Sequence, residues 1–317
     1  MINYVLAFIL SFAIVFLLIP HLKKLAVKVD FVDRPTERKL HREAVPHLAS
    51  IGIFLGFMIT YALFTDAIDK QFVSILIGSL MILSIGIIDD WYKTKQKDFP
   101  ALPKFIIQVS AAILAYQSGM VFYGFTHPFT QEFIILPVIL QFLLSVTWIF
   151  GVTTVINFVD GLDGLAGSIS AISAMTLFVV ALAKGQTDSA LMSIILVGVL
   201  VGYLKFNKQP AQIYMGDAGA TFIGYILGVI ALSGAFKQAT VLSLFIPILA
   251  LGVPIFDNIF VVFKRMYEGK PIYKADRSQI HYRLLSAGLK PKQVVIFLSL
   301  VSLCFGLSSI ILMLLQV

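Results

Sequence analysis

Long apolar stretches recur along almost the whole chain, and they limit the possible folds more than any other feature of the sequence. Hydrophobic residues make up 59% of the 317 residues and charged residues only 13%, about half the charged share of soluble globular domains. A stretch of about 20 apolar residues can cross a bilayer as a helix, which satisfies its own backbone hydrogen bonds. The sequence therefore predicts an all-α polytopic membrane protein without a large soluble domain.

We predict about ten membrane-spanning helices and interpret residues 1–317 as a single integral-membrane domain. The stretch from Ile2 to Ile19 has neither the basic start nor the small-residue cleavage site of a signal peptide, so it is predicted to be a retained span. The single cysteine, Cys304, allows no internal disulfide. The predicted spans are 2–20, 48–65, 71–88, 104–118, 133–153, 164–183, 188–204, 218–235, 240–263 and 293–315.

The basic residues are distributed very unevenly among the connections between these spans. Of 24 lysines and arginines, 21 lie in the odd-numbered connections, and only Lys70, Lys184 and Lys237 lie in the even-numbered ones. Loops rich in Lys and Arg stay in the cytoplasm, so the odd-numbered connections are predicted to be cytoplasmic and both termini to face outward. Because the basic residues are spread over separate loops, the net charge of +7 indicates contact with anionic lipids and not with nucleic acid.

Acidic residues gather at the edges of the apolar stretches on this predicted cytoplasmic side. Asp89 and Asp90 directly follow one stretch, and Asp217 begins another. Carboxylates at such places are costly unless they are solvated, paired or bound to a cation, and their oxygens suit a divalent metal. The alternative interpretations are a solvated helix end for the pair and an ordinary helix cap for Asp217.

The segment 157–167 is the most specific of these acidic features. It places Asn157, Asp160 and Asp163 three residues apart, among glycines and between apolar runs. If the segment is helical, the three side chains share one face, and the acids need a metal, a cation or nucleotide donors as partners. Packing through the glycines explains the glycines but not the acids, so a functional role is favoured.

Two basic loops on the same side carry candidate phosphate-binding residues. Lys39 and His41 lie in the first loop and His281 and Arg283 in the last, and an arginine can donate two parallel hydrogen bonds to a diphosphate. Attraction to anionic lipids is the alternative for both loops. For Asp257, inside the ninth predicted span, structural pairing and catalysis are both open.

Six motifs follow one another along roughly the whole chain, and together they resemble a known family. They are Asp33-Arg-Pro-x-x-Arg-Lys39-x-His41 with Pro46, Gly86-Ile-Ile-Asp89-Asp90, Asn157-x-x-Asp160-Gly-Leu-Asp163-Gly-Leu, Gly216-Asp217-x-Gly219, Gly252-Val-Pro254-x-x-Asp257, and His281-x-Arg283. In order and spacing they resemble the polyprenyl-phosphate N-acetylhexosamine-1-phosphate transferases of glycosyltransferase family 4. The resemblance is greatest to the enzymes that begin wall teichoic acid linkage units and enterobacterial-type glycans, and weaker to the peptidoglycan enzyme.

The resemblance implies a reaction on the cytoplasmic face of a bacterial plasma membrane. Undecaprenyl phosphate would attack the β-phosphorus of UDP-GlcNAc to give GlcNAc-diphospho-undecaprenol and UMP. This would be the first membrane step of a cell-wall or surface glycan, with teichoic acid as the expected product. The implied partners are the bilayer, undecaprenyl phosphate and a UDP-N-acetylhexosamine, and homo-oligomerisation is left open.

The resemblance also implies a role for each candidate residue, with Mg²⁺ as the expected ion and Mn²⁺ as the alternative. Asp217 and Asp90 would ligate the metal, and Asp89 together with Asp90 would act near the lipid phosphate, one of them as the base. The implied catalytic residues are Asp89, Asp90, Asp160 and Asp163. The implied substrate-binding residues are Lys39, His41, Asn157, Gln279, His281 and Arg283.

Several residues depart from the pattern that the resemblance leads us to expect. Ala49 and Ser50 stand where relatives usually have two glycines, Thr154 where they have Asn, and Gln279 and Tyr282 where histidine is frequent. These positions flank the expected nucleotide-sugar pocket, so another UDP-N-acetylhexosamine donor and a non-catalytic, lipid-phosphate-binding paralogue are kept as alternatives. The triple-histidine signature of the peptidoglycan enzyme is absent from the sequence, which disfavours its donor. A transporter is a further alternative, which the clustering of acids at one membrane edge opposes.

Overall fold

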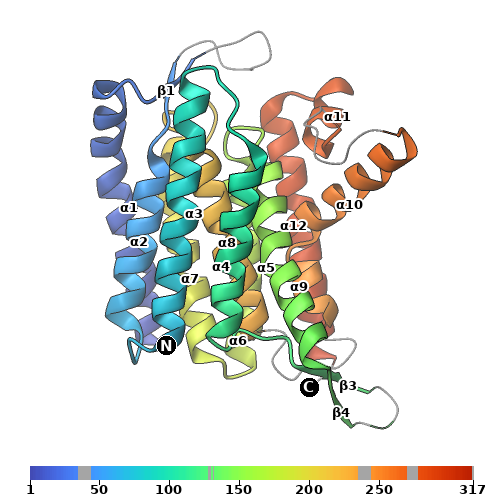
Figure 1. Ribbon diagram of the computed structural model, residues 1–317. Helices are drawn as coiled ribbons and strands as arrows, with labels where there is room; N and C mark the ends of the chain where they lie inside the picture. Colours follow the sequence, from blue (N-terminus) through green and yellow to red (C-terminus); the bar gives the residue numbers. More distant parts are fainter. Residues whose placement is uncertain (35–43, 128–129, 131, 235–243, 270–277, 316–317) are drawn as a thin grey trace.

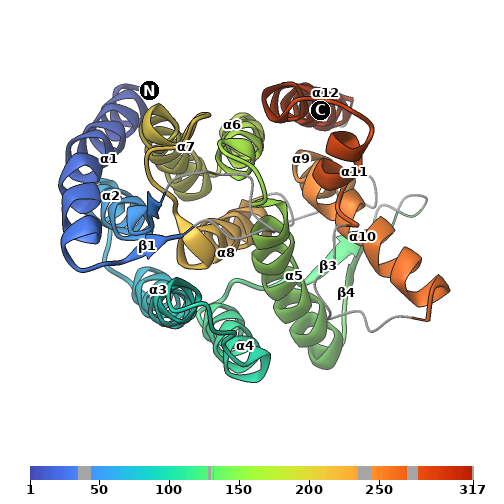
Figure 2. The ribbon, with the colours of Figure 1, turned by 90° about the horizontal axis from the view of Figure 1, so that it is seen from above.

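The structure is a computed structural model that describes residues 1–34, 44–127, 130, 132–234, 244–269 and 278–315. It is a bundle of helices with two short antiparallel strand pairs, β1 with β2 and β3 with β4 (Figures 1 and 2). The strands are β1 (Val32–Asp33), β2 (Val45–Pro46), β3 (Gly124–Thr126) and β4 (Phe133–Ile135). The helices are α1 (Ile2–Lys28), α2 (Ala49–Phe64), α3 (Lys70–Thr94), α4 (Ala101–Gln117), α5 (Val138–Val159), α6 (Leu165–Ala183), α7 (Thr187–Asn207), α8 (Gly216–Gly234), α9 (Phe245–Ala250), α10 (Gly252–Tyr267), α11 (Ile280–Ser286) and α12 (Pro291–Leu314).

Seven helices of the described chain are long and apolar enough to cross a membrane, which confirms a multi-pass, all-α membrane protein. They are α1, α3, α5, α6, α7, α8 and α12. Helices α2 and α4 are also apolar but have only 16 and 17 residues, fewer than the roughly 20 needed to span a bilayer upright. The number of ten spans therefore stays a prediction.

Helix α8 lies at the centre of the bundle and packs against α3 and α5 (Figure 2). Almost all of its residues are buried, as expected of a helix that is apolar on every side. Small residues allow the neighbouring helices to approach closely, as is usual for membrane helices. A Cβ at Gly224 would lie only 2.7 Å from the Cα of Thr153 on α5, so α8 is fixed tightly against its neighbours.

The start of α1 and the end of α12 lie at one end of the bundle, and β1, which follows α1, lies at the other (Figure 1). Helices α3, α5 and α7 end at the same end of the bundle as β1, and α8 begins there. We call this end the site end. This arrangement agrees with the prediction that both termini share a side of the membrane.

The prediction of one continuous helix for the ninth span, 240–263, is wrong, because the described residues of this span form two helices. Helix α9 ends at Ala250, and α10 begins at Gly252 and leads away from the bundle (Figure 1). The physical reason is Pro254, which has no N–H to donate to Ala250 and whose ring would clash with the Ala250 carbonyl in a continuous helix.

Candidate active site

Three carboxylates meet at the site end, where α3 passes the start of α8. One oxygen from each of Asp89, Asp90 and Asp217 lies within 4.8 Å of the other two. Asp89 and Asp90 are each only 1% exposed, because α3 continues beyond them to Thr94. The interpretation of this pair as a solvated helix end is therefore wrong.

Asp90 joins α3 to the first turn of α8. Its two oxygens accept hydrogen bonds from the backbone N–H groups of Asp217 and Ala218, at 2.9 and 3.1 Å. These N–H groups have no partner inside their own helix, and a helix N-terminus favours a negative charge. The cap of α8 thus comes from Asp90 and not from Asp217. The Nε2 of His47 lies 3.8 Å from the same carboxylate.

Two lysines lie among the carboxylates. The Nζ of Lys93 is 2.6 Å from Asp217 Oδ1 and 3.2 Å from Asp89 Oδ2. The Nζ of Lys104, from α4, is 3.1 Å from Asp89 Oδ2 and 4.0 Å from Asp217 Oδ2. Sequence reasoning missed both residues. The helical spacing of Asp89 and Lys93, four residues apart, was the available signal, whereas nothing in the sequence pairs Lys104 with α3.

This cluster has the composition of a divalent-cation site. Its three carboxylates outnumber its two ammonium groups, so a negative charge remains for a cation to neutralise. All of the candidate ligand atoms are oxygens, the ligands that Mg²⁺ and Mn²⁺ prefer. The described residues therefore fit a divalent ion held by Asp89, Asp90 and Asp217.

The segment 157–167 is not one continuous helix, so its acids do not share a helical face. Helix α5 ends at Val159, and Asp160 and Asp163 lie in the connection to α6, which ends with Gly164 in the left-handed region at φ +78°. Asp163 accepts a hydrogen bond of 3.0 Å from the backbone N–H of Ala211, which helps to hold this turn. Asn157 remains on the last turn of α5, half-buried.

Asn207 ties this turn to the segment 208–215, which leads into α8. Its Oδ1 accepts from the N–H of Gly164, and its Nδ2 donates to the carbonyl of Ile213, both at 2.9 Å. Asn207 is only 3% exposed. Together with Asp163 it positions the two segments that border the carboxylates. The sequence gives no signal for this role, because the partners of Asn207 are backbone groups that only the fold brings together.

The pKa of Asp160 is affected by the charge of the carboxylate cluster. Burial, followed by the nearby negative charge of Asp217, raises its pKa to about 7, against the opposing charge of Lys93. A carboxyl group with a pKa near neutrality can hold or release a proton under physiological conditions. The structure thus brings Asp160 into the electrostatic environment of the predicted metal ligands.

Helix α11 places His281 against the same turn. The imidazole is 1% exposed and packs on Gly161 so closely that a Cβ there would overlap the ring. Burial lowers its pKa to about 4, so the ring is neutral at pH 7. Among the described residues, neither buried ring nitrogen has a hydrogen-bond partner.

Arg283 and Gln279 lie around α10, and the structure does not bring them into contact with the carboxylate cluster. Asp257 accepts a hydrogen bond of 2.9 Å from the N–H of Ile280, and an Arg283 nitrogen lies 3.5 Å from it. The Arg283 guanidinium also lies 4.0 Å from the centre of the Phe260 ring, a cation–π distance. Of the two roles open for Asp257, these contacts favour structural pairing.

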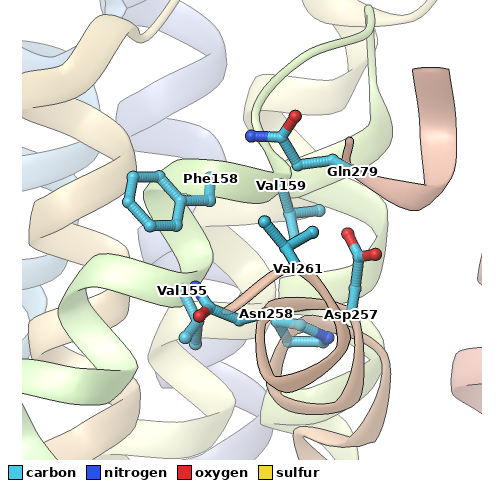
Figure 3. A pocket seen from close by; sticks show the side chains of 8 residues that line it. Val155, Phe158, Val159, Asp257, Asn258, Val261 and Gln279 are labelled. Carbon is cyan, nitrogen blue, oxygen red and sulfur yellow. The ribbon is translucent and has the colours of Figure 1, made fainter. Parts of the chain in front are cut away.

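Gln279 and Asp257 line a small pocket between α5 and α10 (Figure 3). Apolar side chains form much of its remaining wall, among them Phe158, Val159 and Val261 (Figure 3). Two other predicted substrate-binding residues, Lys39 and His41, lie outside the described residues.

The fold and the site define a class of protein, a polytopic membrane protein with a buried acidic and basic site at one end of its helices. The sequence profile of glycosyl transferase family 4 matches residues 72–235, from α3 to just beyond α8. This segment contains every carboxylate predicted for the site. They are Asp89, Asp90, Asp160, Asp163 and Asp217.

Curated relatives are similar along most of the chain. A probable undecaprenyl-phosphate N-acetylglucosaminyl 1-phosphate transferase from Bacillus subtilis (strain 168) is 36% identical over 312 residues, 98% of this chain and 86% of the relative. A decaprenyl-phosphate N-acetylglucosaminephosphotransferase from Mycobacterium leprae (strain TN) is 28% identical, over 90% of this chain and 78% of the relative. An undecaprenyl-phosphate alpha-N-acetylglucosaminyl 1-phosphate transferase from Yersinia pestis is 23% identical, over 96% and 83%. The chain belongs to glycosyl transferase family 4.

Proposed function

We propose that this protein transfers GlcNAc-1-phosphate from UDP-GlcNAc to undecaprenyl phosphate. The observation that carries the proposal is the cluster of Asp89, Asp90 and Asp217 with Lys93 and Lys104 at a membrane edge. The cluster lies inside the segment that matches the family profile. The relatives from Bacillus subtilis and Yersinia pestis are named for this transfer to undecaprenyl phosphate, which supports the same chemistry here.

In the proposed reaction, an oxygen of the lipid phosphate attacks the β-phosphorus of UDP-GlcNAc. The bond from that phosphorus to the bridging oxygen breaks, and UMP leaves with the bonding electrons. The products are GlcNAc-diphospho-undecaprenol and UMP. Little covalent chemistry is required of the protein, so positioning and charge stabilisation would provide most of the catalysis. A site at the end of membrane helices suits a lipid whose phosphate lies at the bilayer surface.

We propose that Asp217 and Asp90, with Asp89, hold a Mg²⁺ ion, with Mn²⁺ as the alternative. A bound ion would neutralise negative charge on the transferring phosphates. The ammonium groups of Lys93 and Lys104 lie at the same carboxylates and can donate charge-assisted hydrogen bonds to phosphate oxygens. Basic and acidic groups in one cluster suit two phosphorylated substrates that would repel each other.

The residues around the cluster have complementary proposed roles. Asp160, with a pKa of about 7, would hold a proton near the reacting phosphates. Neutral His281, with both ring nitrogens lacking a partner among the described residues, would donate a hydrogen bond to the diphosphate. Asn157 would contact the nucleotide, and Asp163 would keep the turn in place through its bond to Ala211.

Gln279 and Arg283 would complete the donor site from the α10 side. Both lie close to Asp257, so their approach to the diphosphate requires α11 to shift relative to α10. Gln279, where relatives often have a histidine, is the reason to keep another UDP-N-acetylhexosamine as an alternative donor. We further propose that the site end faces the cytoplasm of a bacterial cell and that the product enters teichoic acid synthesis.

The test is release of UMP by the purified full-length protein from UDP-GlcNAc, undecaprenyl phosphate and Mg²⁺. UDP-GalNAc is assayed in parallel, and EDTA should abolish release with both donors. If UMP forms only from UDP-GalNAc, then UDP-GalNAc and not UDP-GlcNAc is the donor. No UMP from either donor, with the protein folded and both substrates bound, would support the non-catalytic paralogue and refute the proposal.

A further inference from the structure

A cavity with a volume of about 480 Å³ lies at the site end, between α1 on one side and the last turn of α7 with the segment after it on the other. One face of α1 forms its first wall, through residues at positions i, i+3, i+4 and i+7 of the helix. Phe206 and Gln212 form the second wall. The α1 residues are Pro20, Lys23, Lys24 and Val27. None of these six residues belongs to the carboxylate cluster, which α3, α4 and α8 supply, so this is a separate site.

The lining of the cavity combines positive charge with polar and apolar groups. The Nζ of Lys23 donates a hydrogen bond of 3.2 Å to Gln212 Oε1, which directs the ammonium across the cavity, and Lys24 is exposed beside it. No described lining residue is acidic. Within the part of the chain that the structure describes, neither lysine has a carboxylate partner. Among the described residues, therefore, no carboxylate offsets these two positive charges where an anion would enter.

Aromatic side chains extend the apolar wall along α1 toward the middle of the membrane. The Phe206 ring lies 5.4 Å from that of Phe16, which in turn lies 5.7 Å from that of Phe12. Phe16 is 42% exposed. The lysines of α1 lie at the site end, and its phenylalanines lie within its apolar run. The charged and apolar parts of the cavity wall are therefore arranged like the head group and acyl chain of a lipid.

We propose that this cavity binds an anionic phospholipid of the bilayer. The lipid phosphate contacts Lys23 and Lys24, and one acyl chain lies along Phe206 and Phe16. A soluble phosphate satisfies only the basic half and leaves the aromatic half uncovered, so the lining favours a lipid. The attraction of juxtamembrane lysines to anionic head groups supplies the charge complementarity. The inference goes beyond the proposed function and does not depend on it.

Binding at this cavity is linked by position to the carboxylate cluster. Gln212 belongs to the same segment as Ala211, whose N–H donates to Asp163, and Ile213, whose carbonyl accepts from Asn207. A lipid bound beside Lys23 and Gln212 therefore contacts the segment that leads to Asp217.

The experiment measures lipid retention by the full-length protein with native mass spectrometry. The protein is exchanged from detergent into mixtures of phosphatidylglycerol and phosphatidylcholine. The parent should retain phosphatidylglycerol preferentially, and the double variant Lys23→Gln, Lys24→Gln should lower its affinity roughly tenfold or more. The matched control, Lys95→Gln with Lys97→Gln, removes two exposed lysines from the same end of the molecule and should leave retention unchanged.

A second variant and a competitor test the apolar half and the identity of the anion. Phe16→Asn, at a 42% exposed position of the aromatic wall, should lower retention without a change of charge. Inorganic phosphate at millimolar concentration should not displace the lipid. Equal retention by the parent and the Lys23, Lys24 variant would overturn the proposal, and so would an equal loss in the control pair. Displacement by phosphate alone would identify a soluble-anion site instead.

Discussion

Asp90 and Asp217 are carboxylates of one cluster, yet their partners differ. Both oxygens of Asp90 accept backbone hydrogen bonds from α8, whereas those of Asp217 lie at Lys93 and Lys104. A carboxylate oxygen has two lone pairs, so Asp90 can hold α8 and ligate a cation at the same time. Among the side-chain contacts described, Asp217 accepts no backbone hydrogen bond, and the amide oxygen of an Asn at this position could still accept from Lys93. Its substitution should therefore affect catalysis more than folding.

We therefore expect the same substitution to act differently at these two positions. Asp217→Asn should lower UMP release by about 10²–10³-fold with little change in thermal stability. Asp90→Asn should lower UMP release and also destabilise the fold by about 1–3 kcal/mol, because its amide NH₂ would face a backbone N–H. Differential scanning fluorimetry and UMP release on the same preparations provide both measurements. A stable Asp90→Asn protein would contradict the capping role.

His281 should make the stability of the protein sensitive to acid. Its folded-state pKa of about 4 lies below the unfolded value of about 6.5, so the unfolded chain binds the proton first. The stability provided by the neutral ring is complete above pH 6.5 and is lost as the pH falls toward 4. Between pH 6.5 and 5 the loss amounts to about 2 kcal/mol.

The measurement for His281 is the change in melting temperature between pH 7 and pH 5. His281→Gln keeps a polar side chain without a titrating group, so its melting temperature should fall less over this interval. A matched control is His21→Gln, because His21 is exposed on α1. Equal pH dependence in the parent and the His281 variant would show that the ring is solvated.

Most helices could be predicted from the sequence because apolar runs and membrane helices have similar lengths. Runs such as 293–315 and 71–88 appear as α12 and α3. Helix ends inside the site were predicted poorly, since the turn after α5 depends on Gly164 and on contacts with Ala211 and Asn207. These partners are remote in sequence. Lys104 was not predicted either, because its partners on α3 and α8 are also remote in sequence. Asp89, Asp90 and Asp217 were chosen as candidates because they lie at the edges of apolar runs.

The contact between α3 and α8 depends on Gly86. A Cβ at this position would overlap the backbone of Ala218, in the turn that Asp90 caps. Gly86→Ala should push α8 away, destabilise the protein by about 1–3 kcal/mol and reduce UMP release, since Asp217 would shift as well. Gly151→Ala on α5 is the control, because a Cβ there meets nothing within 4 Å. Stability equal to the parent in both variants would show that the two helices can separate freely.

The distribution of charge along the chain agrees with the arrangement of the helices. Both termini lie at the end opposite the carboxylate cluster (Figure 1), and 21 of the 24 lysines and arginines lie in connections predicted for the other side. The fold establishes that the termini share one end. Which end faces the cytoplasm rests on the charge distribution alone, because the packing of the helices is the same in either orientation.

The orientation can be tested with two cysteines that replace the same residue type at opposite ends. Asp66, between α2 and α3, and Asp98, between α3 and α4, are both exposed. Cys304, exposed on α12, is first replaced by Ser. Because lysine- and arginine-rich loops stay in the cytoplasm, Asp66→Cys should react with a membrane-impermeant maleimide in intact cells. Asp98→Cys should react only after the membrane is opened. Labelling of Asp98→Cys in intact cells, with Asp66→Cys protected, would place the carboxylate cluster outside the cell, out of reach of a cytoplasmic nucleotide sugar.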